Sequence, residues 1–221
     1  MRELPILFSG PMVRAILEGR KTQTRRMVKA SQFPGKFHAR CLAVGVSQTL
    51  REMYFEGRFD ERPFPHGAVG DRLWVRETWA AYTPQDYFTG ECDEIACAPA
   101  GMPERYGTTR SDVVYQADGK SSPYRWRPSI HMPRWASRIL LEVTGVRVER
   151  LWDIAEEDAR AEGVDRANGH PDRGSLLGTG PCFREGFAQA WVDLYGAESW
   201  SVSPWVWVVE FRRIEGASHA A

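Results

Sequence analysis

The sequence predicts one α+β domain with a mostly antiparallel, closed β-sheet, two to three flanking helices and long loop insertions. Short segments that alternate polar and apolar residues indicate strands, and a few segments with apolar residues at helical spacing indicate helices. Stretches rich in glycine and proline separate them, and none looks like a linker between two domains. With 221 residues, 43% of them hydrophobic, the chain is large enough for one substantial core.

The strand signals extend over the whole chain. The apolar run at 4–9 is typical of an edge strand, the segment 72–77 alternates polar and apolar residues, and 113–117 forms another short strand. The longest strand signal covers 137–151, and its apolar register changes at Gly145, which predicts a bulge or tight bend. Residues 204–214 form the last predicted strand.

Three segments are predicted to be helical. Ser9 and Gly10 are cap candidates before Pro11, and Gly19 is a natural stop, so a helix is expected over about 11–18. A charged helix at 153–162 ends at Gly163, and an amphipathic helix covers 183–194.

The net charge is zero, which argues against a protein whose entire surface binds polyanions. However, the segments 19–51 and 120–141 contain basic residues and no aspartate or glutamate. These segments can form a local anion-binding face, or their charges can pair with the acidic segment 149–165. The charge pattern alone leaves both interpretations open.

Several classes of protein are not favoured. The apolar runs are too short to span a bilayer, the N-terminus does not resemble a secretory signal, and four cysteines are too few for a disulfide framework. We therefore expect a cytoplasmic protein without a membrane partner. Cys92 and Cys97 lack a second ligand pair, so no metal site and no cofactor are expected. The sequence does not indicate an oligomeric state.

A basic segment at 19–26 is the first candidate for chemistry. On a strand, Thr22, Thr24 and Arg26 would share one face, with Lys21 at the preceding corner. A lysine near a threonine hydroxyl can act as a base when burial or neighbouring cations such as Arg20 lower its pKa. The same cluster suits a phosphate or a nucleobase carbonyl. An ordinary basic strand edge is the structural alternative.

Two further segments combine charge with aromatic residues. Adjacent strand residues Arg76 and Glu77 must point to opposite faces, so one of them faces the core or a cavity and needs a partner. In the segment 124–135, arginines alternate with aromatic residues around Trp126 and Arg127. Such a pattern suits base stacking with phosphate contact, although the tryptophans could instead close one end of a barrel.

Glu162 stands apart from the other acids of its helix. A carboxylate is unfavourable at a helix C-terminus, so a nearby cation such as Lys21 would explain its position beside Gly163.

Taken together, these motifs resemble a known family. The run Gly19-Arg20-Lys21-Thr22-x-Thr24-x-Arg26 resembles the signature of ASCH domains, and 70–77 is similar to their second strand. With 126–134 and 204–211, the chain resembles long ASCH proteins common in phages and prophages. The resemblance implies a PUA-like β-barrel over 1–221, with insertions at about 28–66, 83–111 and 165–182, and a cleft for a nucleobase or RNA.

The resemblance also implies an activity. Small ASCH proteins include N4-acetylcytidine amidohydrolases, and their lysine, threonine and glutamate correspond to Lys21, Thr24 and Glu162 here. The partner would be RNA or a modified nucleoside, contacted by Arg20, Arg26, Arg76, Glu77, Trp126, Arg127 and His131. Two alternatives stay open: an RNA- or nucleotide-binding module without chemistry, and a ribonuclease that uses His131 with Glu77.

Overall fold

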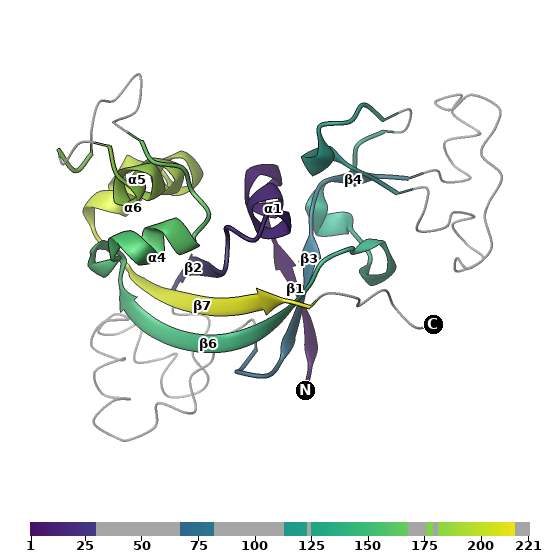
Figure 1. The fold of residues 1–221 in the computed structure, drawn as a ribbon, viewed down its shortest axis with the longest axis horizontal. Helices are drawn as coiled ribbons and strands as arrows, with labels where there is room; N and C mark the ends of the chain where they lie inside the picture. The colour runs from purple at the N-terminus through teal and green to yellow at the C-terminus, as the bar shows by residue number, and fades with distance from the viewer. Residues whose placement is uncertain (30–66, 82–112, 123–124, 168–175, 179–180, 215–221) are drawn as a thin grey trace.

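The computed structural model describes residues 1–29, 67–81, 113–122, 125–167, 176–178 and 181–214. Their centre is a five-stranded sheet of order β1-β3-β6-β7-β2 (Figure 1). The strands are β1 (Glu3–Leu7), β2 (Gln23–Met27), β3 (Arg72–Arg76), β6 (Leu140–Arg150) and β7 (Trp205–Arg213). β1 and β2 lie at the two edges of the sheet and do not pair with each other within the described segments. The α+β class is therefore confirmed, whereas the closed barrel is not.

The sheet is mixed, with mainly antiparallel pairing. β1 runs parallel to β3, whereas β3–β6, β6–β7 and β7–β2 are antiparallel. The bulge predicted at Gly145 is confirmed, because the β6–β7 register shifts between Val143 and Gly145. A Cβ at Gly145 would lie 2.7 Å from Oε2 of Glu210, so a larger residue there would require the Glu210 side chain to move.

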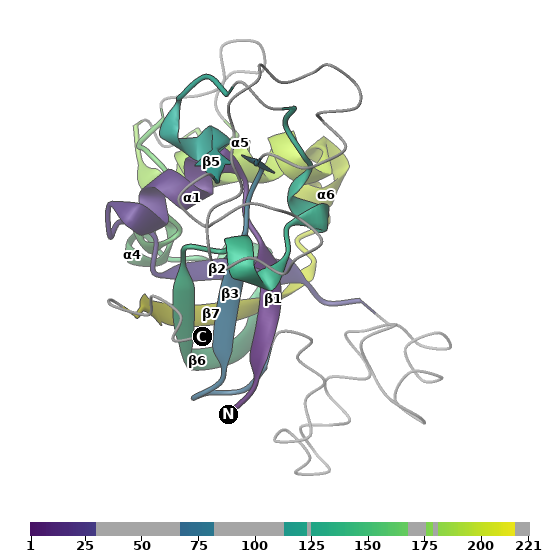
Figure 2. The same cartoon turned by 90° about the vertical axis from the view of Figure 1, so that its right-hand side faces the viewer.

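The described chain contains four α-helices, one more than the upper number predicted. They are α1 (Gly10–Leu17), α4 (Glu156–Ala161), α5 (Phe183–Tyr195) and α6 (Ala197–Ser201). The helices α4, α5 and α6 gather at one end of the curved β6–β7 ribbon, and α1 stands beside them (Figure 1). Figure 2 shows α1 and α5 on the same side of the sheet. On the far side of α1 lies a small sheet of β4 (Trp79–Ala80) and β5 (Val114–Tyr115).

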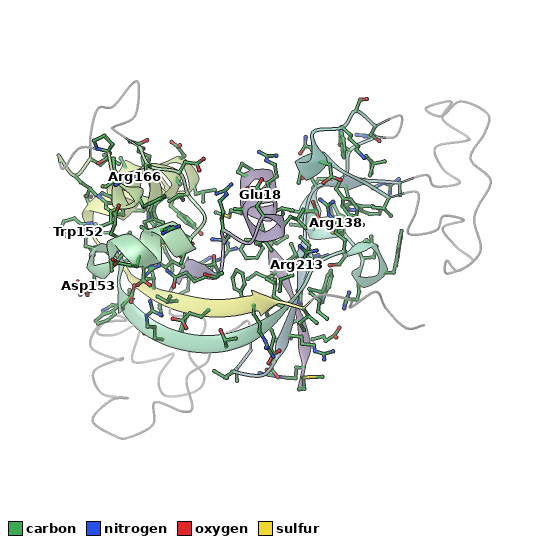
Figure 3. The ribbon with its side chains drawn as sticks, in the orientation of Figure 1. Glu18, Arg138, Trp152, Asp153, Arg166 and Arg213 are labelled. Atoms are coloured by element: carbon green, nitrogen blue, oxygen red, sulfur yellow. The ribbon has the colours of Figure 1, made fainter. Side chains whose placement is uncertain are left out.

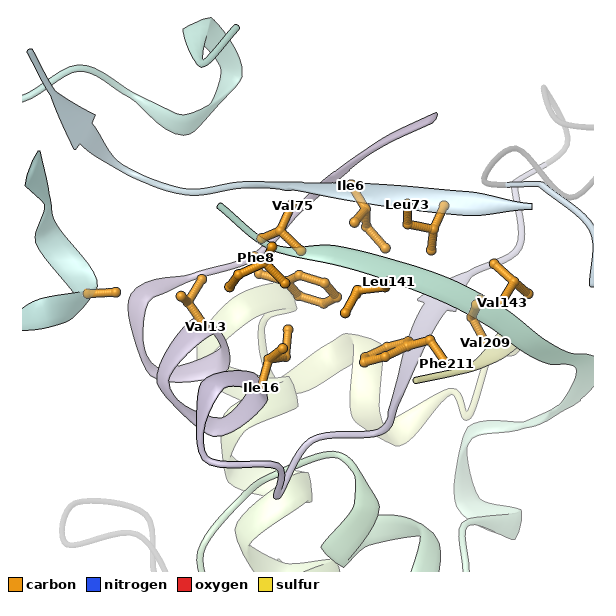
Figure 4. Close-up of a cluster of buried hydrophobic side chains, with 12 residues drawn as sticks. Ile6, Phe8, Val13, Ile16, Leu73, Val75, Leu141, Val143, Val209 and Phe211 are labelled. Carbon is orange, nitrogen blue, oxygen red and sulfur yellow. The ribbon is translucent and has the colours of Figure 1, made fainter. Parts of the chain in front are cut away.

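Two hydrophobic clusters fill the space between the sheet and the helices. The first packs α1 against β1, β3, β6 and β7, and includes Ile16, Val209 and Phe211 (Figure 4). The second packs α4 and α5 against β7 and includes Val206 and Val208. β7 therefore contributes side chains to both clusters.

The predicted insertions fall mostly outside the described residues. None of the helices described is both long and apolar enough to cross a membrane.

Candidate functional site

The structure brings Lys21 and Glu162 together in a buried ion pair. Nζ of Lys21 donates to Oε2 of Glu162 at 2.7 Å and to its backbone oxygen at 2.9 Å. The Lys21 side chain has no exposed surface. Glu162 is the residue that ends α4, and it forms an isolated bridge with Lys21, which follows α1. The cation thus offsets the unfavourable position of a carboxylate at a helix end.

Gly163 makes this approach possible. Its φ of +77° is unfavourable for other residues, and a Cβ there would lie 2.7 Å from Cβ of Lys21. Lys21 and the end of α4 can therefore pack together only with glycine at position 163.

Arg25 fixes the orientation of the Glu162 carboxylate. Its Nη1 donates to Oε1 of Glu162 at 3.1 Å, which leaves Oε2 for Lys21. Its Nη2 lies 2.5 Å from Oε1 of Glu149 and 3.0 Å from Oδ2 of Asp158. Arg25 was not among the residues predicted to be catalytic. The alternation of β2 placed it opposite Thr24, but nothing local indicated that three carboxylates converge on it.

Burial and the contact with Glu162 act in opposite directions on the charge of Lys21. Burial lowers the pKa of Lys21, and the charge of Glu162 and its hydrogen bond oppose this effect. A neutral lysine amine keeps two N–H donors, enough for both contacts with Glu162, and gains a lone pair that can accept a proton. The pair can therefore exist as an amine beside a carboxylate without losing a hydrogen bond.

A cavity of about 480 Å³ lies beside this pair, between α1, β2 and α5. Thr24, Arg25 and Glu162 form part of its wall, and Lys21 lies behind Glu162, outside the lining. The opposite wall on α5 carries aromatic side chains, among them Phe187 and Trp191. The volume is within the range of small-molecule sites, and aromatic rings opposite polar groups are typical of such pockets.

Two of the predicted binding residues also line the cavity. Arg20 donates to the backbone oxygen of Gly163 at 2.8 Å and pairs with Glu18 at 2.6 Å. Arg26 donates from Nη2 to the backbone oxygen of Leu7 at 2.5 Å.

The other predicted binding residues do not line the cavity. Glu77 is fully buried, and Arg138 binds both of its carboxylate oxygens at 2.9 Å. Burial raises the pKa of Glu77, against the effect of Arg138. Figure 3 places Arg138 and Arg166, a residue of the cavity wall, on opposite sides of α1. The Glu77–Arg138 pair therefore belongs to the region around the small sheet.

Arg76 and Arg127, two other predicted binding residues, contact neighbouring groups outside the cavity. Arg76 donates from Nε to the backbone oxygen of Met132 at 3.0 Å, and the guanidinium of Arg127 lies 5.6 Å from the ring of Trp79. Trp126 is half-buried and His131 is exposed. Within the described segments, no hydrogen bond joins His131 to Glu77, whose carboxylate is bound by Arg138.

Comparisons with known proteins assign no function to this site. No protein-family model, curated protein or solved structure matches the chain. The resemblance to ASCH domains therefore rests on the motifs of this sequence, and the role of the site rests on its geometry.

The described residues contain no group of three or more His, Cys, Asp or Glu side chains that could hold a metal ion. Cys92 and Cys97 lie outside these residues.

Proposed function

We propose that this protein is a cytoplasmic ASCH-type, PUA-like protein that takes RNA or a modified pyrimidine nucleoside into the cavity and hydrolyses an N-acyl amide there. One observation carries the proposal: Glu162, which lines the cavity together with Thr24, holds a buried lysine through its carboxylate. The proposal requires the Lys21 amine, whose pKa burial lowers, to reach the Thr24 hydroxyl, because such a pair activates a threonine nucleophile.

The proposed reaction has two steps. Lys21 in its amine form accepts the proton of Thr24, whose oxygen attacks the acyl carbon, and Lys21 then returns this proton to the departing nitrogen. Water, activated by the same amine, hydrolyses the acyl group from Thr24 and yields a carboxylic acid. Alternatively, Thr24 positions the water that attacks directly. In both routes Glu162 orients Lys21 through the 2.7 Å contact.

Groups around the cavity suit the rest of the substrate. Arg26 or a backbone N–H would stabilise the negative oxygen that forms during attack. On the aromatic wall of α5, the half-buried ring of Tyr195 would contact a base, backed by the buried rings of Phe187 and Trp191.

The test is release of acetate from N4-acetylcytidine, followed by liquid chromatography. Thr24→Val keeps the shape and β-propensity of the buried residue, and we expect the rate to fall about 100-fold or more because the nucleophile is lost. The matched control is Thr22→Val, an exposed threonine two residues earlier, which should keep full activity. A wild-type protein that releases no acetate, or a Thr24→Val variant that releases it at the normal rate, contradicts the proposal.

A second function is favoured by the burial of Lys21. Because its side chain has no exposed surface, a substrate in the cavity meets Glu162 first, which suits a module that binds RNA or a nucleotide without chemistry. Such a module would bind RNA with an affinity that falls as salt rises, with no turnover. Salt-insensitive binding would count against it.

A further inference from the structure

Basic and acidic side chains line different walls of the cavity. The side formed by α1 and β2 contributes Arg14, Arg25 and Arg26 and no acidic residue. The acids of the lining lie elsewhere, on the segment after α4 and on α5, for example Glu162 and Asp193. One side of the cavity is therefore positively charged.

Arg14 and Arg26 differ from Arg25 in their partners. Arg25 is neutralised by three carboxylates, whereas neither Arg14 nor Arg26 pairs with an acid in the described part of the chain. Arg14 donates from Nη1 to the backbone oxygen of Ala117 at 3.1 Å, and Arg26 donates to that of Leu7. A carbonyl holds a guanidinium in place without cancelling its charge.

Both guanidinium groups also have donors to spare. A guanidinium carries five N–H donors, and each of the two uses few of them. Nε of Arg26 is buried and has no hydrogen-bond partner, which is costly unless a ligand provides one. The Phe8 ring, 5.4 Å from the guanidinium carbon of Arg26, helps to keep that side chain in position.

The two groups are close to the same short connection. Arg26 binds the last residue of β1, Leu7, and Nη1 of Arg14 would lie 3.7 Å from a Cβ on Gly10, the first residue of α1. Ser9, between them, also lines the cavity, and its hydroxyl is not used to cap α1. Two charged groups with free donors and one free hydroxyl thus surround one end of the cavity.

We propose that this end of the cavity binds the phosphate of a pyrimidine mononucleotide, so that the ligand is a nucleotide and not a neutral nucleoside. Paired guanidinium groups with free N–H donors are the usual receptors for phosphate, since their planar donors match its oxygens. The base would then extend toward the aromatic wall of α5 and Thr24, and a backbone N–H, instead of Arg26, would stabilise the negative oxygen. This last part rests on the proposed function, whereas phosphate binding does not.

The test is a binding titration that needs no turnover. The full chain is titrated with cytidine, cytidine 5′-monophosphate and inorganic phosphate, and tryptophan fluorescence is followed because Trp191 lines the cavity. We expect the monophosphate to bind at least tenfold more tightly than cytidine and inorganic phosphate to compete with it. Arg14→Gln and Arg26→Gln should each remove most of this preference. Arg212→Gln, an exposed arginine of β7 paired with Glu142, removes the same charge elsewhere and should preserve it.

Several results would overturn the inference. They are equal affinity for cytidine and its monophosphate, absence of binding by both, unchanged preference in Arg14→Gln, or an equal loss in Arg212→Gln. Tight binding of a short RNA without binding of the monophosphate would also overturn it. Arg14 is exposed, so its variant tests the inference even if Arg26→Gln fails to fold. A protein that prefers the monophosphate but releases no acetate would refute only the hydrolysis.

Discussion

Replacement of Glu162 by glutamine should destabilise the protein strongly and in a pH-dependent way. Glutamine keeps the shape and an oxygen that can accept from Lys21, but it removes the only carboxylate that pairs with this buried ammonium in the described residues. Loss of one member of a buried ion pair costs about 3–5 kcal/mol, because the other charge stays buried without compensation. We therefore expect the free energy of unfolding at pH 7 to fall by about this amount.

The pH dependence provides the sharper test. Burial lowers the pKa of Lys21 in the folded protein, whereas an unfolded lysine holds its proton up to about pH 10.4. Between the two values the unfolded state binds more protons, so stability rises with pH. Without Glu162 the folded-state pKa falls further, so the variant should regain more stability than the wild type as the pH rises from 7 to 9.5.

Urea denaturation followed by circular dichroism at both pH values measures the effect. Glu157→Gln is the matched control, since Glu157 is an exposed acid of the same helix and its replacement should change stability by no more than about 0.5 kcal/mol. A Glu162→Gln variant within about 1 kcal/mol of the wild type at pH 7, or a difference that widens at pH 9.5, would refute the reasoning.

Two further predictions concern stability. The backbone N–H groups of Arg2 and Ala68 lower the pKa of Asp71 from 3.8 to about 2, so its contribution to stability is present above pH 3.8 and is lost as the pH falls through about 2. Acid titration should therefore show a smaller loss of stability for Asp71→Asn than for the wild type, and equal acid sensitivity would exclude this role. Gly163→Ala combines a φ of +77° with a contact of 2.7 Å to Lys21, whereas Gly119→Ala, at φ +69°, meets nothing within 4 Å. Urea denaturation should show a loss of about 1–2 kcal/mol for Gly119→Ala and a larger loss for Gly163→Ala; equal losses would mean that the contact with Lys21 is relaxed without cost.

The elements with long, regular patterns could be predicted from the sequence. The strands β6 and β7, the helix α5 and the bulge at Gly145 all follow from apolar periodicity and its interruption. α6 was missed because Ala197–Ser201 is too short to show a period. The parallel pairing of β1 with β3 was also missed, since periodicity describes a strand's faces but not its neighbours.

The candidate site, too, could be predicted only where its signal is local in the sequence. The contact between Lys21 and Glu162 follows a local expectation, that a carboxylate at a helix end needs a cation. Their catalytic role, with that of Thr24, stays a prediction. The importance of Arg25 could not be predicted, because its partners Glu149, Asp158 and Glu162 are brought together only by the folded chain. The cavity could not be predicted for the same reason, because α5 closes it from a distant part of the chain.

The position of β7 in both hydrophobic clusters has a consequence for how the protein unfolds. Val206 and Val208 pack beneath α4 and α5, while Val209 and Phe211 pack beneath α1. Neither group of helices can detach without exposing a side of this one strand to water. The two ends of the domain should therefore melt in a single transition, and the backbone amides of β7 should be among the last to exchange their hydrogens with solvent.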